Sequence, residues 1–274
     1  MGTESEESVK SGLSKREALA LTRLAARNKT ILTIADIEAV IDVSYSEAKK
    51  VANNLVHKKW LDRLKSGTYL IVPLEAGEKG EYTEHEYVIA SHLADSMYLS
   101  YWTSLNHHGL TEQVPLTVYA ATTDRVPTRE IHNVTYQFVT VTEKKFFGYN
   151  AESVDTYRVN IASVEKALVD CADHPEYCGG ITELGKALKN ADGLDTELLA
   201  EYLIEMGNGA AVKRIVYLAD LYDINLENRE MLEDAFTKGY SKLDPTRGDG
   251  KHTRKYRLQL NVSEDELETV GDRY

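Results

Sequence analysis

Apolar residues near the start of the chain recur at helical spacing in successive short segments. The spacing predicts a helix over residues 14–28, where Ser14 supplies a capping hydroxyl and Glu17 follows three residues later. A second, shorter helix is predicted over 34–41, with Thr33 as its capping residue. The inner face of the first helix is expected to consist of Ala18, Leu21, Leu24 and Ala25.

A third helix is predicted to begin at Ser44 or Ser46, after a break at Asp42-Val43. Its apolar stripe is formed by Ala48, Val51, Ala52 and Leu55. Its polar side carries Ser46, Lys49, Lys50, Asn53 and His57, with Asn54 near the edge. Ammonium groups pair with phosphates, and an Asn amide can donate and accept together against an adenine edge. This polar face therefore fits a groove of duplex DNA.

Polar and apolar residues then alternate over 61–72 around Ser66-Gly67, which predicts a hairpin that carries Arg63 and Lys65. Three helices followed by a hairpin are the order of a winged helix-turn-helix. A solvated helix beside an ordinary hairpin is the plainer interpretation, but the order of the elements favours DNA. In this hypothesis the asparagines read base edges and the cations neutralise phosphates. The predicted DNA-binding residues are Ser46, Lys49, Lys50, Asn53, Asn54, Arg63 and Lys65.

The pattern changes after the hairpin. Residues 73–83 are rich in charge and glycine and predict a domain boundary before a helix that Thr83 caps and that runs through Leu93. An aromatic helix is predicted over 96–108. Strands are predicted over 116–122, 134–141, 146–149 and 156–161. Helices are predicted over 164–172, 181–188, 196–206, 210–222 and 226–238. A last strand over 255–262 is expected to return to the existing sheet.

Strands grouped before helices indicate an α+β fold, with an N-terminal winged helix-turn-helix followed by a larger mixed α/β C-terminal domain. The predicted parts are a flexible leader (1–13), the winged helix-turn-helix (14–74), the α+β domain (84–262) and an acidic tail (263–274).

The net charge of −12 is divided unevenly along the chain. Residues 8–74 hold twelve Lys or Arg against six Asp or Glu, and three glutamates lie in the first seven positions, so the remainder carries about −15. The basic part can approach a polyanion that the rest repels. Two cysteines and no apolar run long enough to cross a bilayer predict a cytoplasmic protein with reduced thiols and no membrane partner.

Four segments carry a family resemblance. They are the winged-helix run that ends in 63–70 (RLKSGTYL), 104–111 (SLNHHGLT), 161–170 (IASVEKALVD) with Gly179-Gly180 behind it, and 256–262 (YRLQLNV). In this order the chain resembles the AbiEi antitoxin family, transcriptional regulators of type IV toxin-antitoxin and abortive-infection systems. The resemblance spans most of the chain, and the order of the segments is more specific than any one of them.

The resemblance implies a non-enzymatic repressor that binds double-stranded operator repeats in front of a bicistronic operon. It also implies that the C-terminal domain counters a nucleotidyltransferase-like toxin encoded beside it, without a stable complex between the two proteins. No cofactor, metal or catalytic residue is expected.

Two groups of residues could instead carry metal chemistry. The first is Cys171, Asp173, His174 and Cys178, whose spacing fits no structural zinc pattern, so inert thiols are expected. The second is Glu143-Lys144-Lys145 with Asp124, which matches the acid-x-lysine arrangement of metal-dependent nucleases. Such a short pattern also arises by chance in a chain with 28% charged residues.

Other polar and aromatic groups have structural interpretations. Lys166 and Asp170 lie one helical turn apart and predict a surface ion pair worth ~0.3–0.5 kcal/mol, with a toxin-facing role as the alternative. His107-His108 predicts a helix C-terminus before Gly109. Gly179-Gly180 lacks the Lys-Ser/Thr of a phosphate-binding loop. The aromatic group Tyr98, Tyr101 and Trp102 predicts interdomain core rather than a base-stacking surface.

Two further function classes stay open at this point. One is a metal-dependent nuclease targeted by the winged helix, which a magnesium or manganese cleavage assay with Glu143→Ala as control would distinguish. The other is a plain effector-responsive transcriptional regulator with no toxin, which the absence of an adjacent nucleotidyltransferase-like reading frame would favour.

Overall fold

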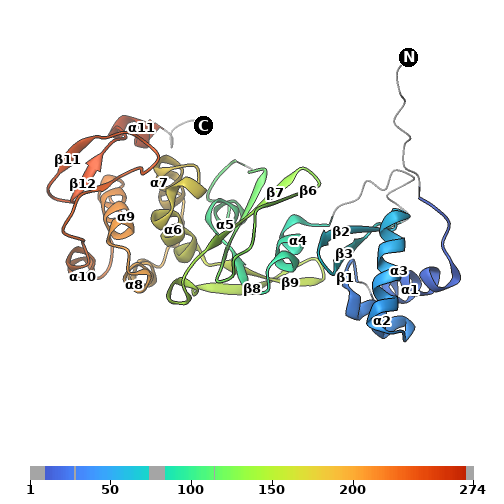
Figure 1. Cartoon of the computed structure of the whole chain (residues 1–274). Coiled ribbons are helices and arrows are strands. Elements are labelled where there is room, and N and C mark those ends of the chain that lie inside the picture. Colours follow the sequence, from blue (N-terminus) through green and yellow to red (C-terminus); the bar gives the residue numbers. More distant parts are fainter. Residues whose placement is uncertain (1–9, 28, 74–83, 114, 270–274) are drawn as a thin grey trace, which may run out of the picture. The chain divides into compact units, whose positions relative to one another are not determined.

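The computed structural model describes residues 10–27, 29–73, 84–113 and 115–269. The chain divides into two compact units, an N-terminal unit (residues 1–93) and a C-terminal unit (residues 94–274) (Figure 1). Helix α4 (Glu86–Leu93) therefore groups with the winged-helix elements, whereas the sequence placed it in the larger domain. Apart from Pro73, the predicted boundary segment over 73–83 lies outside the described residues, and so does the helix cap at Thr83.

The first three helices of the N-terminal unit begin where their capping residues predict. Helix α1 (Lys15–Ala25) starts after Ser14, whose hydroxyl accepts from the Glu17 N–H, and ends three residues before the predicted limit. Helix α2 (Ile34–Ile41) has the predicted bounds and the predicted Thr33 cap. Helix α3 (Tyr45–His57) follows Ser44.

Three antiparallel strands complete the N-terminal unit in the order β1-β3-β2: β1 (Ile31–Thr33), β2 (Leu61–Lys65) and β3 (Thr68–Ile71). The predicted hairpin joins β2 to β3, and Gly67 takes the φ of +78° that its turn requires. Strand β1 was not predicted. It pairs Ile31 with Leu70 and Thr33 with Thr68, so it depends on a partner far along the chain.

The C-terminal unit is built on a mixed six-stranded sheet in the order β6-β7-β5-β4-β9-β8. Its strands are β4 (Met97–Leu99), β5 (Thr117–Thr122), β6 (Arg129–Ile131), β7 (Val134–Thr140), β8 (Tyr149–Val154) and β9 (Tyr157–Ala162). Helix α5 (Tyr101–His107) follows β4, so the helix predicted over 96–108 begins five residues late. The strand predicted over 146–149 is wrong, because a 3₁₀ turn (Glu143–Lys145) and Gly148 at φ +72° precede β8.

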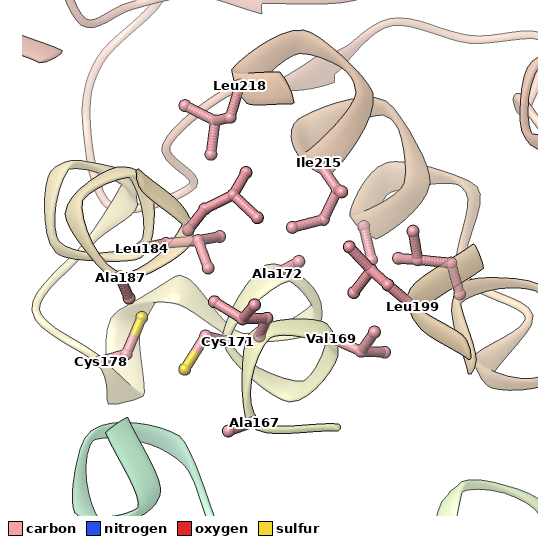
Figure 2. Packing of buried hydrophobic residues seen from close by; sticks show 14 of the residues in the cluster. Ala167, Val169, Cys171, Ala172, Cys178, Leu184, Ala187, Leu199, Ile215 and Leu218 are labelled. Atoms are coloured by element: carbon pink, nitrogen blue, oxygen red, sulfur yellow. The ribbon is translucent and has the colours of Figure 1, made fainter. Parts of the chain in front are cut away.

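Helices follow the sheet, as predicted, and they form the larger core. They are α6 (Val164–Asp173), α7 (Ile181–Lys189), α8 (Thr196–Met206), α9 (Gly209–Leu221) and α10 (Arg229–Asp234). Figure 2 shows apolar side chains of α6 to α9 converging, with Val169, Leu184, Leu199 and Ile215 among them. The fold is therefore α+β, with an N-terminal winged helix-turn-helix and a larger mixed part.

The last strand does not return to the six-stranded sheet, which corrects the prediction. Strand β12 (Leu258–Leu260) lies between β10 (Ser241–Lys242) and β11 (Lys251–Thr253) in a separate sheet. Buried cations of α9 explain the separation. The Arg214 guanidinium donates to the carbonyls of Lys242 and Leu243, which anchors the segment containing β10 on α9.

The helix predicted over 226–238 is shorter than expected for a related reason. The buried Lys213 ammonium donates to the Thr237 hydroxyl at 2.7 Å and to the Gly239 carbonyl at 2.6 Å. These bonds hold the chain after α10 in a non-helical conformation. Within the predicted acidic tail, α11 (Glu264–Thr269) forms a helix, and Leu267 belongs to the core.

A buried ion pair lies between α6 and the sheet. Lys166 (0% exposed) and Asp170 (1% exposed) pair within the C-terminal unit, so the predicted pair exists but its predicted surface position is wrong. Asp170 also accepts from the Ser100 hydroxyl at 2.6 Å and the Tyr98 hydroxyl at 3.1 Å. The Lys166 ammonium lies 4.6 Å from the Phe147 ring centroid. Burial excludes contact of this pair with a toxin in the folded chain.

Candidate nucleic-acid interface

The core of the N-terminal unit fixes the orientation of α3. All four residues of the predicted apolar stripe are buried: Ala48, Val51, Ala52 and Leu55. They pack in a cluster with Ala20 and Leu24 of α1 and with Ile37 of α2. The predicted inner face of α1 needs one correction, because Ala25 is exposed and Ala20 is buried instead. With this stripe buried, the opposite side of α3 must face solvent.

The opposite side presents the residues that the sequence singled out. The exposed side chains on α3 include Ser46, Lys49, Lys50, Asn53, Asn54 and His57. In the part of the chain that the structure describes, Lys49, Lys50 and Asn53 form no side-chain hydrogen bond or ion pair. Their polar atoms are therefore available to a ligand without the loss of an internal bond.

The two asparagines differ in position around the helix. At about 100° per residue, Asn53 projects within roughly 30° of the direction opposite the buried stripe, whereas Asn54 projects about 70° from it. Asn54 lies on the side of Glu47, whose carboxylate accepts from the Ser44 hydroxyl at 3.0 Å and pairs with Arg16 at 3.4 Å. The bonds from Ser44 hold the pKa of Glu47 below its ordinary value, so this edge of α3 carries an anion at neutral pH.

Several other cations of the unit are bound to groups of the protein. Lys58 pairs with Glu17 at 2.6 Å, Lys29 pairs with Asp36 at 2.5 Å, and Arg23 donates to the Val40 carbonyl. These contacts connect helices and loops. Lys49 and Lys50 differ from them, because they stand beside each other on α3 without such partners among the described residues.

The hairpin places Arg63 and Lys65 differently. Arg63 is exposed, with its guanidinium carbon 5.6 Å from the Tyr69 ring centroid and a bond to the Tyr69 hydroxyl at 3.3 Å. Lys65 is half-buried, and its ammonium donates to the Leu93 carbonyl at the end of α4 at 3.4 Å. Arg63 is thus displayed on the wing, whereas Lys65 is directed toward α4.

Glu17 links the start of α1 to the end of α3. Burial alone would raise the pKa of Glu17, but bonds from Lys58 and Ser14 outweigh it and hold the pKa below its ordinary 4.5. Stability from this carboxylate is present above pH ~4.5 and is lost as the pH falls through the lower folded-state pKa. We expect Glu17→Gln to cost about 1 kcal/mol at pH 7 and little near pH 3.

The chain has two tryptophans, Trp60 in the N-terminal unit and Trp102 in the C-terminal unit, so Trp102→Phe makes Trp60 fluorescence report on the N-terminal unit alone. Thermal unfolding of the full chain with this reporter, with and without Glu17→Gln, measures the effect. The role of Glu17 would be contradicted if Glu17→Gln lost as much stability between pH 7 and pH 3 as the wild-type chain does.

The alternative metal sites do not assemble. In the described residues, no group of three or more His, Cys, Asp or Glu side chains is placed to hold a metal ion. Cys171 and Cys178 are free and buried, and burial raises the pKa of the Cys171 thiol, so it stays protonated. In the nuclease-like group, Glu143 is exposed and the Lys145 ammonium pairs with Asp173 at 2.6 Å.

The other groups singled out by the sequence also have structural roles. His107 ends α5 as predicted, and the ring nitrogen Nε2 of His108 lies 2.7 Å from the Ala162 carbonyl oxygen. Gly180 precedes α7, whose first N–H donates to Asp244 at 3.1 Å. Tyr98 and Tyr101 are buried in the core of the C-terminal unit itself.

A second group of basic residues was missed by sequence reasoning. Residues 238–257 hold seven Lys or Arg against two Asp, within an otherwise acidic part of the chain. Lys238, Lys251 and Arg254 are exposed there, without ion pairs among the described residues. A count of charge in short windows would have found this segment. Replacement of exposed cations in this segment removes positive charge outside α3 and can serve as a control for the same replacement in α3.

The comparisons with known proteins bear on the N-terminal unit and on the fold. Residues 20–72 match the sequence model of a family described as "Transcriptional regulator, AbiEi antitoxin", which confirms the predicted resemblance over the segment that contains α3 and the wing. The match supports a DNA-binding role for this segment. Among curated proteins, none matches the chain.

The crystal structure of the RV2827C protein from Mycobacterium tuberculosis is similar to this chain, with a TM-score of 0.68 and 16% sequence identity. The similarity covers 97% of this chain and 98% of that chain. At this identity it shows a shared fold alone. Within the described residues, no helix has the length and apolar character needed to cross a membrane.

Proposed function

We propose that this chain is a DNA-binding transcriptional repressor and the antitoxin of a type IV toxin-antitoxin system. It binds operator DNA in front of its own operon and counters a nucleotidyltransferase-like toxin encoded beside it. The observation that carries the proposal is the exposed polar face of α3, in a segment that matches an antitoxin regulator family.

In the proposed mechanism, α3 enters a major groove of the operator. Asn53 reads a base edge, because its amide stands near the centre of the exposed face and has no internal partner among the described residues. Lys49 and Lys50 neutralise phosphates beside the groove, and Arg63 contacts the backbone from the wing. Ser46 and Asn54 flank these contacts. Lys65 joins them once its bond to Leu93 opens.

The antitoxin role is proposed for the C-terminal unit and rests on the family resemblance. The toxin and the antitoxin form no stable complex in this proposal. The exposed charges of the C-terminal unit, rather than its buried Lys166–Asp170 pair, are accessible to other molecules. We propose no catalytic step for the chain.

Two measurements separate the parts of this proposal. Titration of the full chain against duplex DNA from upstream of its own reading frame tests operator binding. Co-expression with the adjacent reading frame tests neutralisation, with growth as the readout. The Lys49→Ala/Lys50→Ala chain should lose repression and still rescue growth when its expression is driven from an unrelated promoter.

If the full chain bound the upstream duplex no more tightly than a duplex of scrambled sequence, the repressor role would be refuted. Failure of the wild-type chain to rescue growth would refute the antitoxin role and favour a plain regulator. Metal-dependent cleavage of the duplex that Glu143→Ala abolishes would favour the nuclease alternative.

A further inference from the structure

An aromatic residue that the sequence interpretation passed over lies at the edge of the exposed face of α3, about 80° around the helix from Asn53. Tyr45 is 58% exposed, the most exposed large hydrophobic side chain of the N-terminal unit among the described residues. No hydrogen bond, ring contact or ion pair involves its side chain in the described part of the chain. Its truncation would therefore remove little packing from the core of this unit.

The position of Tyr45 along α3 connects it with the proposed reading residue. Tyr45, Lys49, Asn53 and His57 are spaced by four residues and are all exposed, so they form one row that turns about 80° around the helix between Tyr45 and Asn53. Glu47 lies outside this row, on the other edge of the exposed face. The row thus presents an aromatic ring, a cation and an amide to a ligand without an anion between them.

We propose, on the basis of the proposed function, that Tyr45 is a specificity-determining residue whose ring packs against a thymine methyl group. The base edges in the major groove present hydrogen-bonding groups and one apolar group, the C5 methyl of thymine. An exposed ring on a helix that enters the groove loses water most favourably against that methyl group.

The helix geometry places the thymine relative to the base that Asn53 reads. Eight residues separate Tyr45 from Asn53, which corresponds to about 12 Å along the helix axis. For a helix that follows the groove, this span covers about three or four base pairs at 3.4 Å each. The thymine is therefore expected three or four base pairs from the position at which Asn53→Ala changes base preference.

The test uses duplexes selected by the full chain from a randomised pool. Each thymine is replaced in turn by deoxyuridine, which removes the methyl group and leaves pairing unchanged. For the wild-type chain, one replacement at the expected spacing should weaken binding about fourfold. Tyr45→Ala should be insensitive to that replacement, whereas Tyr45→Phe, which keeps the ring, should remain sensitive.

Tyr240→Ala is the matched control, since this tyrosine is 45% exposed and lies in the C-terminal unit. It should respond to deoxyuridine like the wild type. Equal sensitivity of Tyr45→Ala and the wild type, or no sensitive thymine at all, would overturn the role of Tyr45 and leave the proposed function standing. Failure of the wild-type chain to select any duplex would overturn both.

Discussion

Replacement of Lys49 and Lys50 together by alanine is expected to weaken binding to every duplex on the order of thirtyfold near 0.15 M salt. The reason is the release of counterions from DNA, since each neutralised phosphate contributes about 0.9 to the slope of log affinity against log salt. Both ammonium groups are exposed and lack partners among the described residues, so their removal should cost the fold little. Loss of two contacts should therefore lower the slope by about 2.

Titrations at several salt concentrations, on a selected duplex and on a scrambled one, measure this effect. Lys251→Ala/Arg254→Ala removes the same charge from exposed positions of the C-terminal unit and serves as the control. We expect the control to change affinity and slope much less. An equal loss in both double variants would show that overall charge, rather than α3, determines affinity.

Replacement of Asp170 by leucine is expected to destabilise the C-terminal unit by about 3–5 kcal/mol. The change leaves the Lys166 ammonium buried without its counter-charge and removes the acceptor of the Ser100 and Tyr98 hydroxyls. The midpoint of thermal unfolding should fall by roughly 6–20 °C in a unit of this size. Trp102 fluorescence in a Trp60→Phe background follows this unit alone.

The double variant Lys166→Met/Asp170→Leu separates the pair from the packing. It removes both buried charges together, so it should be clearly more stable than Asp170→Leu alone. A double variant as unstable as the sum of its single variants would contradict the coupling of the two charges.

Helices were the most predictable part of the fold, because their signals are local. Helix α2 has the predicted bounds, and so does α8 (Thr196–Met206). In both, a residue directly before the first turn caps the helix: Thr33 accepts from Asp36, and Asp195 accepts from Leu198. Such a side chain marks the boundary without help from distant segments.

Short strands and the burial of charged side chains could not be predicted, because both depend on partners far along the chain. The three residues of β4 are all buried and pair with β5 and β9, so they show no alternation of polar and apolar positions. The spacing of Lys166 and Asp170 is that of a surface pair, and the pair is buried by residues of other segments, among them Tyr98, Ser100 and Phe147.

In the candidate site, too, the features that depend on local sequence were predicted and those that depend on distant segments were not. The orientation of α3 followed from its apolar stripe, and each of its five predicted DNA-binding residues is exposed. The environment of Lys65 did not follow, because its acceptor is the Leu93 carbonyl, which belongs to a later helix. Tyr45 was not predicted, because charged and amide side chains make most contacts with DNA, although its spacing from Lys49 was visible in the sequence.

In the proposed function, the exposed face of α3 reads duplex DNA through Asn53. Its most direct test is a binding titration of Asn53→Ala against a set of duplexes that differ from the selected site by one base pair each, with Asn54→Ala as the matched control. We predict that Asn53→Ala loses about 1–3 kcal/mol of discrimination at one base pair and little elsewhere, while Asn54→Ala keeps that discrimination. Unchanged base preference in Asn53→Ala would contradict the proposed reading of DNA by α3.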